Sequence, residues 1–139
     1  MEIKVNIGDS KTKKTYNKTL TEEQVIPLIG KKIGNIVKGD SLELPAGYEL
    51  EIRGGSDNAG FPMRKDVNGS VRKKILIVGG VGMKNHGRKG LKLRKMVTGN
   101  TISEQTSQIN LKVVKWGKEP IEKPEEPKSD ESSEEAKAE

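Results

Sequence analysis

The chain has 139 residues, with 26 Lys and Arg side chains against 20 Asp and Glu and a formal net charge of +6. It contains no cysteine, which excludes disulfides and thiolate metal sites. No apolar run approaches the roughly 18 residues of a transmembrane helix, and the amino terminus lacks the apolar run of a signal peptide, so we expect no membrane partner.

The first third of the chain predicts two strands and one short helix. Ile3, Val5 and Ile7 alternate with polar residues, which is typical of a strand with one buried face. Residues 12–19 are polar but compatible with a strand, and could return as its partner. Thr21–Gln24 then has the pattern of a capping box, which predicts a helix through Ile29. Pro27 should keep that helix short and distorted.

An alternating segment, residues 48–53, predicts a strand that leads into a loop rich in glycine. Residues 52–63 read Ile-Arg-Gly-Gly-Ser-Asp-Asn-Ala-Gly-Phe-Pro-Met. This stretch resembles the signature of the small-subunit ribosomal protein six family of archaea and eukaryotes. The positions that match are Ile52, Gly54, Gly55, Asp57, Gly60, Pro62 and Met63.

We interpret residues 54–63, the signature loop, as structural. Asp57 is the only acid in it, and no catalytic partner sits at motif spacing. An Asp in a Gly-rich turn commonly accepts hydrogen bonds from nearby backbone amides, which is the role we expect for it. Phe61 and Met63 should anchor the loop to the domain.

Asn68-Gly69 predicts a hairpin turn between residues 63–67 and 71–78. The apolar run at 75–78 suggests that its second strand is buried on both faces. Five cations lie on the two arms of this expected hairpin and could extend an RNA-binding surface, although ordinary hairpin solubility explains them almost as well. They are Arg64, Lys65, Arg72, Lys73 and Lys74.

Residues 84–95, the basic segment, hold six cations and no acid. Gly87 and Gly90 bracket Arg88-Lys89, which would let the backbone approach a phosphate closely. Leu91, Leu93 and Val97 should then point inward on a strand at 91–98, leaving two cations outward. A solvated charged face is the alternative reading, but the absence of acid favours RNA. The candidate RNA-binding residues here are Lys84, Asn85, His86, Arg88, Lys89, Lys92, Arg94 and Lys95.

The sequence gives no support for an enzyme, a cofactor or a metal site. His86 is the only histidine, and we interpret it as a loop residue beside RNA or water. Gly82–Gly87 has the glycine spacing of a phosphate-binding loop but continues Arg88-Lys89 in place of Lys-Ser/Thr. We therefore expect no small-molecule substrate.

A last strand is predicted at 109–116, with Trp116 either in the core or at its rim. Several short strands, frequent turns and one helix indicate a mainly β fold, a small barrel-like domain. Residues 1–118 contain only four aromatic side chains. Because proteins that grip single strands usually stack bases on aromatic rings, this composition suits phosphates and RNA shape better.

The charge changes sign near the carboxyl end. Residues 1–118 hold 23 basic against 11 acidic side chains, whereas residues 119–139 hold 3 against 9. The second segment has three prolines and one large aliphatic side chain, too few apolar groups to offset its ordering entropy. We therefore predict a basic RNA-binding domain at 1–118 and a disordered acidic tail at 119–139, which could mask the basic surface until RNA displaces it.

The resemblance covers residues 1 to about 117. It implies a non-enzymatic structural protein of the small ribosomal subunit, in the cytoplasm, with ribosomal RNA and neighbouring ribosomal proteins as partners. The long basic carboxyl-terminal helix of eukaryotic members is replaced by the acidic tail, which points to a short archaeal form. A free-standing RNA-binding translation factor or RNA chaperone remains the alternative.

Overall fold

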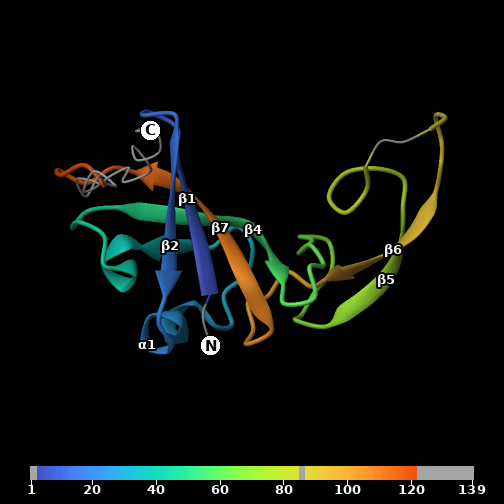
Figure 1. Cartoon of the computed structure of the whole chain (residues 1–139), viewed down its shortest axis with the longest axis horizontal. Helices are drawn as coiled ribbons and strands as arrows, with labels where there is room; N and C mark the ends of the chain where they lie inside the picture. Colours follow the sequence, from blue (N-terminus) through green and yellow to red (C-terminus); the bar gives the residue numbers. More distant parts are fainter. Residues whose placement is uncertain (1–2, 85–86, 122–139) are drawn as a thin grey trace, which may run out of the picture.

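The computed structural model describes residues 3–84 and 87–121, and its strands form two separate sheets (Figure 1). We call the larger sheet, together with the helical turns packed on it, the body. Its five strands run in the order β2 (Lys14–Leu20), β1 (Ile3–Asp9), β7 (Thr106–Lys115), β4 (Glu49–Asp57) and β3 (Ile36–Lys38).

Period-two alternation produces the central strands of the body, as predicted. Ile3, Val5 and Ile7 are buried on one face of β1, and polar residues lie between them. β1 pairs with β2 in antiparallel fashion and with β7 in parallel, so the amino-terminal strand lies inside the sheet. The expected return strand is confirmed as β2.

Three short helical segments accompany the sheet: α1 (Glu22–Val25), η1 (Ile26–Leu28) and η2 (Gly39–Leu42). The predicted capping box is present at α1, where the Thr21 amide donates to Oε1 of Gln24 at 3.2 Å. The α-helix changes to a 3₁₀ turn at Ile26, immediately before Pro27, whose ring and missing N–H prevent the helix from continuing. The short, distorted helix is therefore confirmed.

The hydrophobic core lies between the sheet and these helical segments. A charged side chain connects the edge strand β2 to η2, because Nζ of Lys18 donates to the carbonyl of Leu42 at 2.6 Å. The mainly β fold with one short helix is confirmed. The fully buried apolar side chains of the body are Ile3, Val5, Ile7, Leu20, Leu28, Val37, Leu42, Leu50, Ile52, Ile102, Ile109 and Val113.

Trp116 lies at the rim of the core and is half-buried. Its Nε1 donates to Oδ1 of Asp9 at 2.8 Å, and the Lys11 ammonium stands 4.0 Å above its ring centre. Two body contacts continue past it: the Tyr48 hydroxyl donates to the Glu119 carbonyl at 2.6 Å, and Ile121 packs against the core. The division at residue 118 stays a prediction, and tail residues 122–139 lie outside the described part.

The second sheet is a two-stranded ribbon of β5 (Arg72–Ile77) and β6 (Leu93–Thr98), and the predicted hairpin across Asn68-Gly69 is wrong. β5 pairs with β6, whose residues come after the basic segment. The carbonyl of Gly69 instead accepts from the Thr101 amide at 3.1 Å. The bend at Asn68-Gly69 therefore contacts the segment that follows β6 and does not join two paired strands. The strand that pairs with β5 lies further along the sequence.

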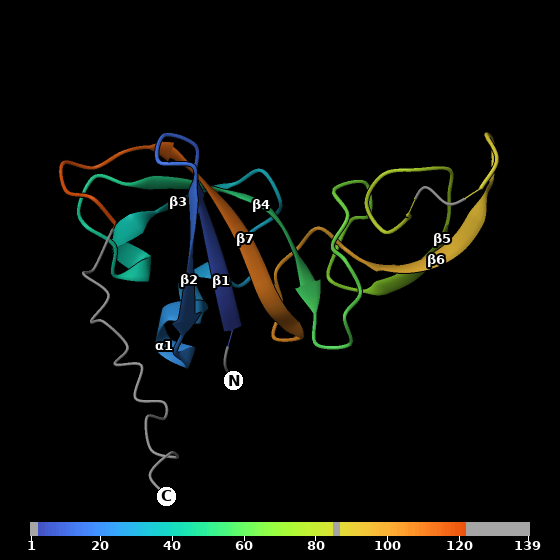
Figure 2. The same cartoon turned by 45° about the horizontal axis from the view of Figure 1, so that its top comes forward.

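The predicted burial of residues 75–78 on both faces is also wrong. Only Ile77 is buried, whereas Leu76 and Val78 are more than half exposed. Of the three side chains expected inward on the last basic strand, Val97 is buried, Leu91 is half-buried and Leu93 is 38% exposed. The reason is architectural, since the ribbon extends beyond the body and has no second sheet packed on it (Figures 1 and 2).

Within residues 3–84 and 87–121, no helix is long and apolar enough to cross a membrane.

The signature loop begins as a continuation of β4 and supplies a matched stability test. A Cβ at Gly55 would lie 2.2 Å from the Gln108 carbonyl oxygen on β7, whereas nothing lies within 4 Å of a Cβ at Gly54. Gly55→Ala should therefore lower the free energy of unfolding by about 1–3 kcal/mol. Gly54→Ala should stay within about 1 kcal/mol of the parent. Urea unfolding followed by Trp116 fluorescence measures both, and equal effects would contradict this packing.

Candidate nucleic-acid interface

Most of the predicted RNA-binding residues belong to the ribbon and to the segment that connects its two strands. We call residues 71–98 the arm, which comprises β5, β6 and the segment between them. Both views show the arm projecting from one end of the body (Figures 1 and 2). In sequence, the arm holds nine basic side chains and no Asp or Glu. A projecting element of one charge is suited to a polyanion.

One face of the arm is covered by its own connecting segment. The chain turns back after β5 at Gly82, whose φ of +92° favours glycine. A Cβ at Gly82 would lie 3.3 Å from Cγ1 of Val97 and 3.6 Å from Cδ1 of Ile77, with Pro62 of the signature loop at 3.5 Å. Val97, Ile77 and Pro62 thus surround Gly82 closely, and this apolar cluster joins the arm to the signature loop.

Arg64 supports this turn from inside the molecule. Its Nη1 donates to the Val81 carbonyl at 2.8 Å, and its Nη2 donates to Oδ2 of Asp66 at 2.7 Å. Only 16% of its side chain is exposed. Although the sequence placed Arg64 among the RNA-binding candidates, its hydrogen bonds are directed at protein atoms.

Arg72 joins the arm to the body through Asp57, at the point where β4 ends and β5 begins. Its Nε donates to Oδ2 of Asp57, and its Nη2 donates to Oδ1 of Asn58 at 2.6 Å. The guanidinium also lies over the Phe61 ring, 5.6 Å from the centroid. We call this set of contacts the Arg72 clamp.

The Asp57 side chain is fully buried, and its environment favours the charged form. The hydrogen bond from Arg72 holds the pKa of Asp57 below its ordinary value, against the opposing effect of burial. The Asn58 amide also donates to Oδ1 at 2.6 Å, which is the backbone hydrogen bond that the sequence predicts for this residue. The ion pair to Arg72 adds a second partner.

The other predicted loop residues occupy structural positions. Met63 is buried in the core, and its amide donates to the Gly55 carbonyl at 3.0 Å. Phe61 is half-buried beneath Arg72, and Gly60 turns the chain with a φ of +85°. The signature loop thus supports the arm, because Asp57 and Phe61 contact Arg72 at the start of β5.

The predicted RNA-binding cations other than Arg64 and Arg72 face solvent. None of those in the described part of the chain forms an ion pair with another described residue. Asn85 and His86, which the sequence also proposes, lie outside the described residues. The exposed cations are Lys65, Lys73, Lys74, Lys84, Arg88, Lys89, Lys92, Arg94 and Lys95.

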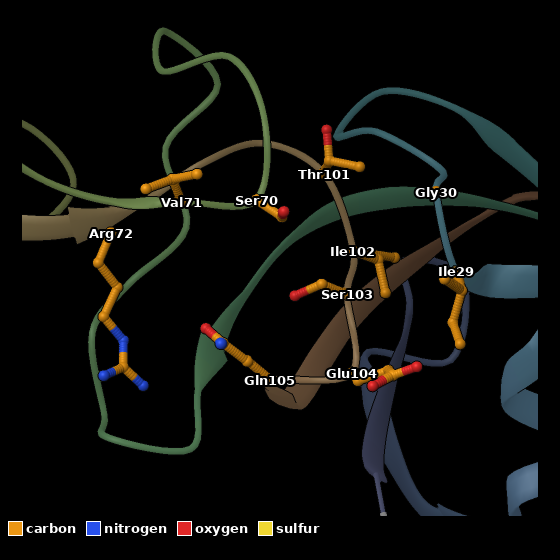
Figure 3. A pocket seen from close by; sticks show the side chains of 10 residues that line it. All are labelled: Ile29, Gly30, Ser70, Val71, Arg72, Thr101, Ile102, Ser103, Glu104 and Gln105. Carbon is orange, nitrogen blue, oxygen red and sulfur yellow. The ribbon is translucent and has the colours of Figure 1, made fainter.

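A shallow groove of about 680 Å³ separates the base of the arm from the body (Figure 3). Ile29 and Ile102 lie on its body side, Val71 on its arm side, and the Arg72 side chain points toward the loop after β4. Among the residues described, no group of three or more His, Cys, Asp or Glu side chains could hold a metal ion. The groove marks the junction that the Arg72 clamp spans.

Comparison with known proteins identifies the family. Residues 3–126 match the sequence profile of the family described as Ribosomal protein S6e. The chain belongs to the ribosomal protein S6e family. The resemblance carried by the signature loop is therefore confirmed.

Several archaeal proteins of the S6e family are similar over most of their length, and each carries the name small ribosomal subunit protein eS6. The protein from Archaeoglobus fulgidus is 47% identical over 122 residues, which cover 88% of this chain and 94% of the relative. That from Methanococcus maripaludis strain C5 is 46% identical, covering 87% and 94%. That from Methanocaldococcus jannaschii is 44% identical, covering 83% and 84%.

The Arg72 clamp predicts an acid-sensitive junction in this S6e protein. Because the folded pKa of Asp57 is lowered, its stabilisation is present above the ordinary value of 3.8 and is lost as the pH falls through the folded value. Asp57→Asn should lower the free energy of unfolding at neutral pH by about 1–3 kcal/mol. The difference between variant and parent should shrink as the pH falls below 3.8 and through the folded pKa of Asp57.

Urea unfolding across pH measures this effect. Asp66→Asn is the matched control, since Asp66 pairs with an arginine but its side chain is 71% exposed, and exposed pairs contribute little. A pH-independent difference for Asp57→Asn would contradict a charged Asp57 in the clamp.

Proposed function

We propose that this protein binds the ribosomal RNA of the small subunit through the exposed cations of its arm. Membership of the S6e family makes it a non-enzymatic structural constituent of the small ribosomal subunit, ribosome-bound in the cytoplasm. Its partners are therefore components of the ribosome. The observation that supports the finer proposal is the arm itself, which projects from the body and whose sequence holds nine basic and no acidic side chains.

The arm offers two kinds of cation to phosphate groups. Arg88 and Lys89 lie between Gly87 and Gly90, whose φ values of +103° and +80° allow a tightly turned backbone. Lys92 immediately precedes β6, and Arg94 projects from it, so their backbones are held by the ribbon. Cations on a tight turn and cations on a strand suit phosphates at different positions along folded RNA.

Arg64 and Arg72 have a different role in this proposal. Both direct their guanidinium groups at protein acceptors, so they position the arm and leave phosphate contacts to the exposed cations. An arm that is already oriented loses less entropy on binding than a mobile one, which favours affinity. We therefore propose direct RNA contacts for the exposed cations, with Asn85 and His86, which lie outside the described residues, as further candidates.

Phosphate contacts predict a steep dependence of affinity on salt. If about six phosphates are contacted, log affinity should fall with log salt at a slope of roughly −4 to −5. Arg88→Ala and Lys92→Ala should each reduce the size of that slope by about 0.7–0.9. Filter binding of the full chain to small-subunit ribosomal RNA transcribed in vitro measures the slope.

Lys38→Ala is the matched control, because Lys38 is an exposed cation on β3 of the body and should leave the slope unchanged. A slope near zero, or equal changes in all three variants, would rule out the arm as the phosphate-binding element.

Assembly into the ribosome provides an independent test. Sucrose-gradient sedimentation of a native lysate should find the protein with the small subunit, and retained there through a high-salt wash, because an integral constituent dissociates slowly. Arm variants that lose several exposed cations should shift toward the light fractions. Recovery of the parent protein in the light fractions would instead indicate a transient RNA-binding factor.

A further inference from the structure

The arm has one face that its connecting segment does not cover. Cross-strand partners share a face of an antiparallel ribbon, and successive residues alternate between faces. Lys74 pairs with Met96 and Leu76 pairs with Arg94, so these four side chains lie together. We call them the free face, because Val97 and Ile77, which meet the turn at Gly82, lie on the opposite side.

The free face exposes two large apolar side chains between two cations. Leu76 is 54% exposed and Met96 is 36% exposed. They are diagonal neighbours, which lie about 7–8 Å apart on a sheet and so form one patch. Single exposed apolar residues need no explanation, but here they share one face of a charged ribbon.

The body does not cover this patch. Both side chains, Leu76 and Met96, stay exposed in the folded chain, and the ribbon as a whole extends away from the body in both views (Figures 1 and 2). The apolar cluster that stabilises the arm is already built on the opposite face, from Val97, Ile77 and Pro62. Leu76 and Met96 are therefore available to a partner.

The charge of the arm identifies the class of that partner. Lys74 and Arg94 flank the apolar pair, and no acid occurs anywhere in the arm sequence. An acidic surface complements this positive charge, and under the proposed function the acidic partner is RNA. The arm also contains no Phe, Tyr or Trp, the side chains on which unpaired bases usually stack.

We propose that the free face packs into the minor groove of double-helical RNA. That groove is wide and shallow in A-form RNA and displays riboses and base edges, whereas the major groove is too narrow for a ribbon. Leu76 and Met96 contact the ribose surface, and Lys74 and Arg94 reach phosphates on either side. This inference rests on the proposed RNA-binding function and adds the form of RNA that the arm recognises.

The test separates apolar contact from charge. Leu76→Thr combined with Met96→Gln removes the apolar patch but keeps strand propensity at one position and side-chain length at the other. Loss of two partly buried apolar contacts should weaken binding about tenfold, with the salt slope unchanged. Lys74→Ala should weaken binding and also reduce the size of the slope by about 0.7–0.9. Ile36→Thr is the matched control, because Ile36 is an apolar residue 55% exposed on β3 of the body.

Fluorescence anisotropy of the full chain with labelled probes gives the affinities. The probes are an RNA hairpin with a long uninterrupted stem, a single-stranded RNA of the same length and a DNA duplex of the same sequence. The parent should prefer the RNA stem over both alternatives, since only A-form RNA offers the wide minor groove with 2′-hydroxyl groups. Thermal melting of each variant confirms that the arm variants remain folded.

Three outcomes would overturn the inference. Unchanged affinity of the Leu76→Thr, Met96→Gln variant, together with weaker binding by Lys74→Ala, would show binding by charge alone and leave the proposed function intact. Preference for single-stranded RNA would show that the arm recognises unpaired bases and not the minor groove. Equal affinities of the parent and of all variants, including Arg88→Ala, would remove both the inference and the proposed function.

Discussion

The ion pair between Asp57 and Arg72 is the contact on which the arrangement of the molecule depends. Asp57 ends β4 in the core sheet and is fully buried, whereas Arg72 begins the ribbon. A buried carboxylate needs an opposite charge and hydrogen bonds to be stable, and the arm supplies both. The buried Asp57 carboxylate therefore holds the body and the arm together, because the opposite charge that it needs comes from the arm. A basic residue has to stand where the arm leaves the body.

This constraint divides the basic residues in and near the arm into two groups. Arg64 and Arg72 have planar, multidentate heads, and both are used to fix the protein to itself. The exposed cations beyond them carry the charge that faces outward. Composition alone cannot separate the groups, because a basic residue in a basic stretch has the same appearance whether its partner is a protein carboxylate or a phosphate.

Much of the body could be predicted from local sequence. The alternation of Ile3, Val5 and Ile7, the capping box at Thr21 and the strand before the signature loop all depend on near neighbours, and all are confirmed. The pairing of β5 with β6 could not be predicted, because its partner strands are joined by a long connection and the Asn-Gly dipeptide offered a shorter alternative. The Arg72 clamp was missed for a related reason. The pair is separated by 15 residues, and the stacking on Phe61 depends on the fold.

The arm is built in a way that favours binding over its own stability. A two-stranded ribbon is marginal by itself, and the arm built on this one carries nine cations, whose mutual repulsion no acidic side chain in the arm offsets. Its apolar support is small, consisting mainly of Val97, Ile77 and the turn at Gly82, with Pro62 from the signature loop. Phosphate groups would relieve the repulsion, so the bound arm should be more stable than the free one. The signature loop and the Arg72 clamp hold the arm in position in the protein before it binds the polyanion.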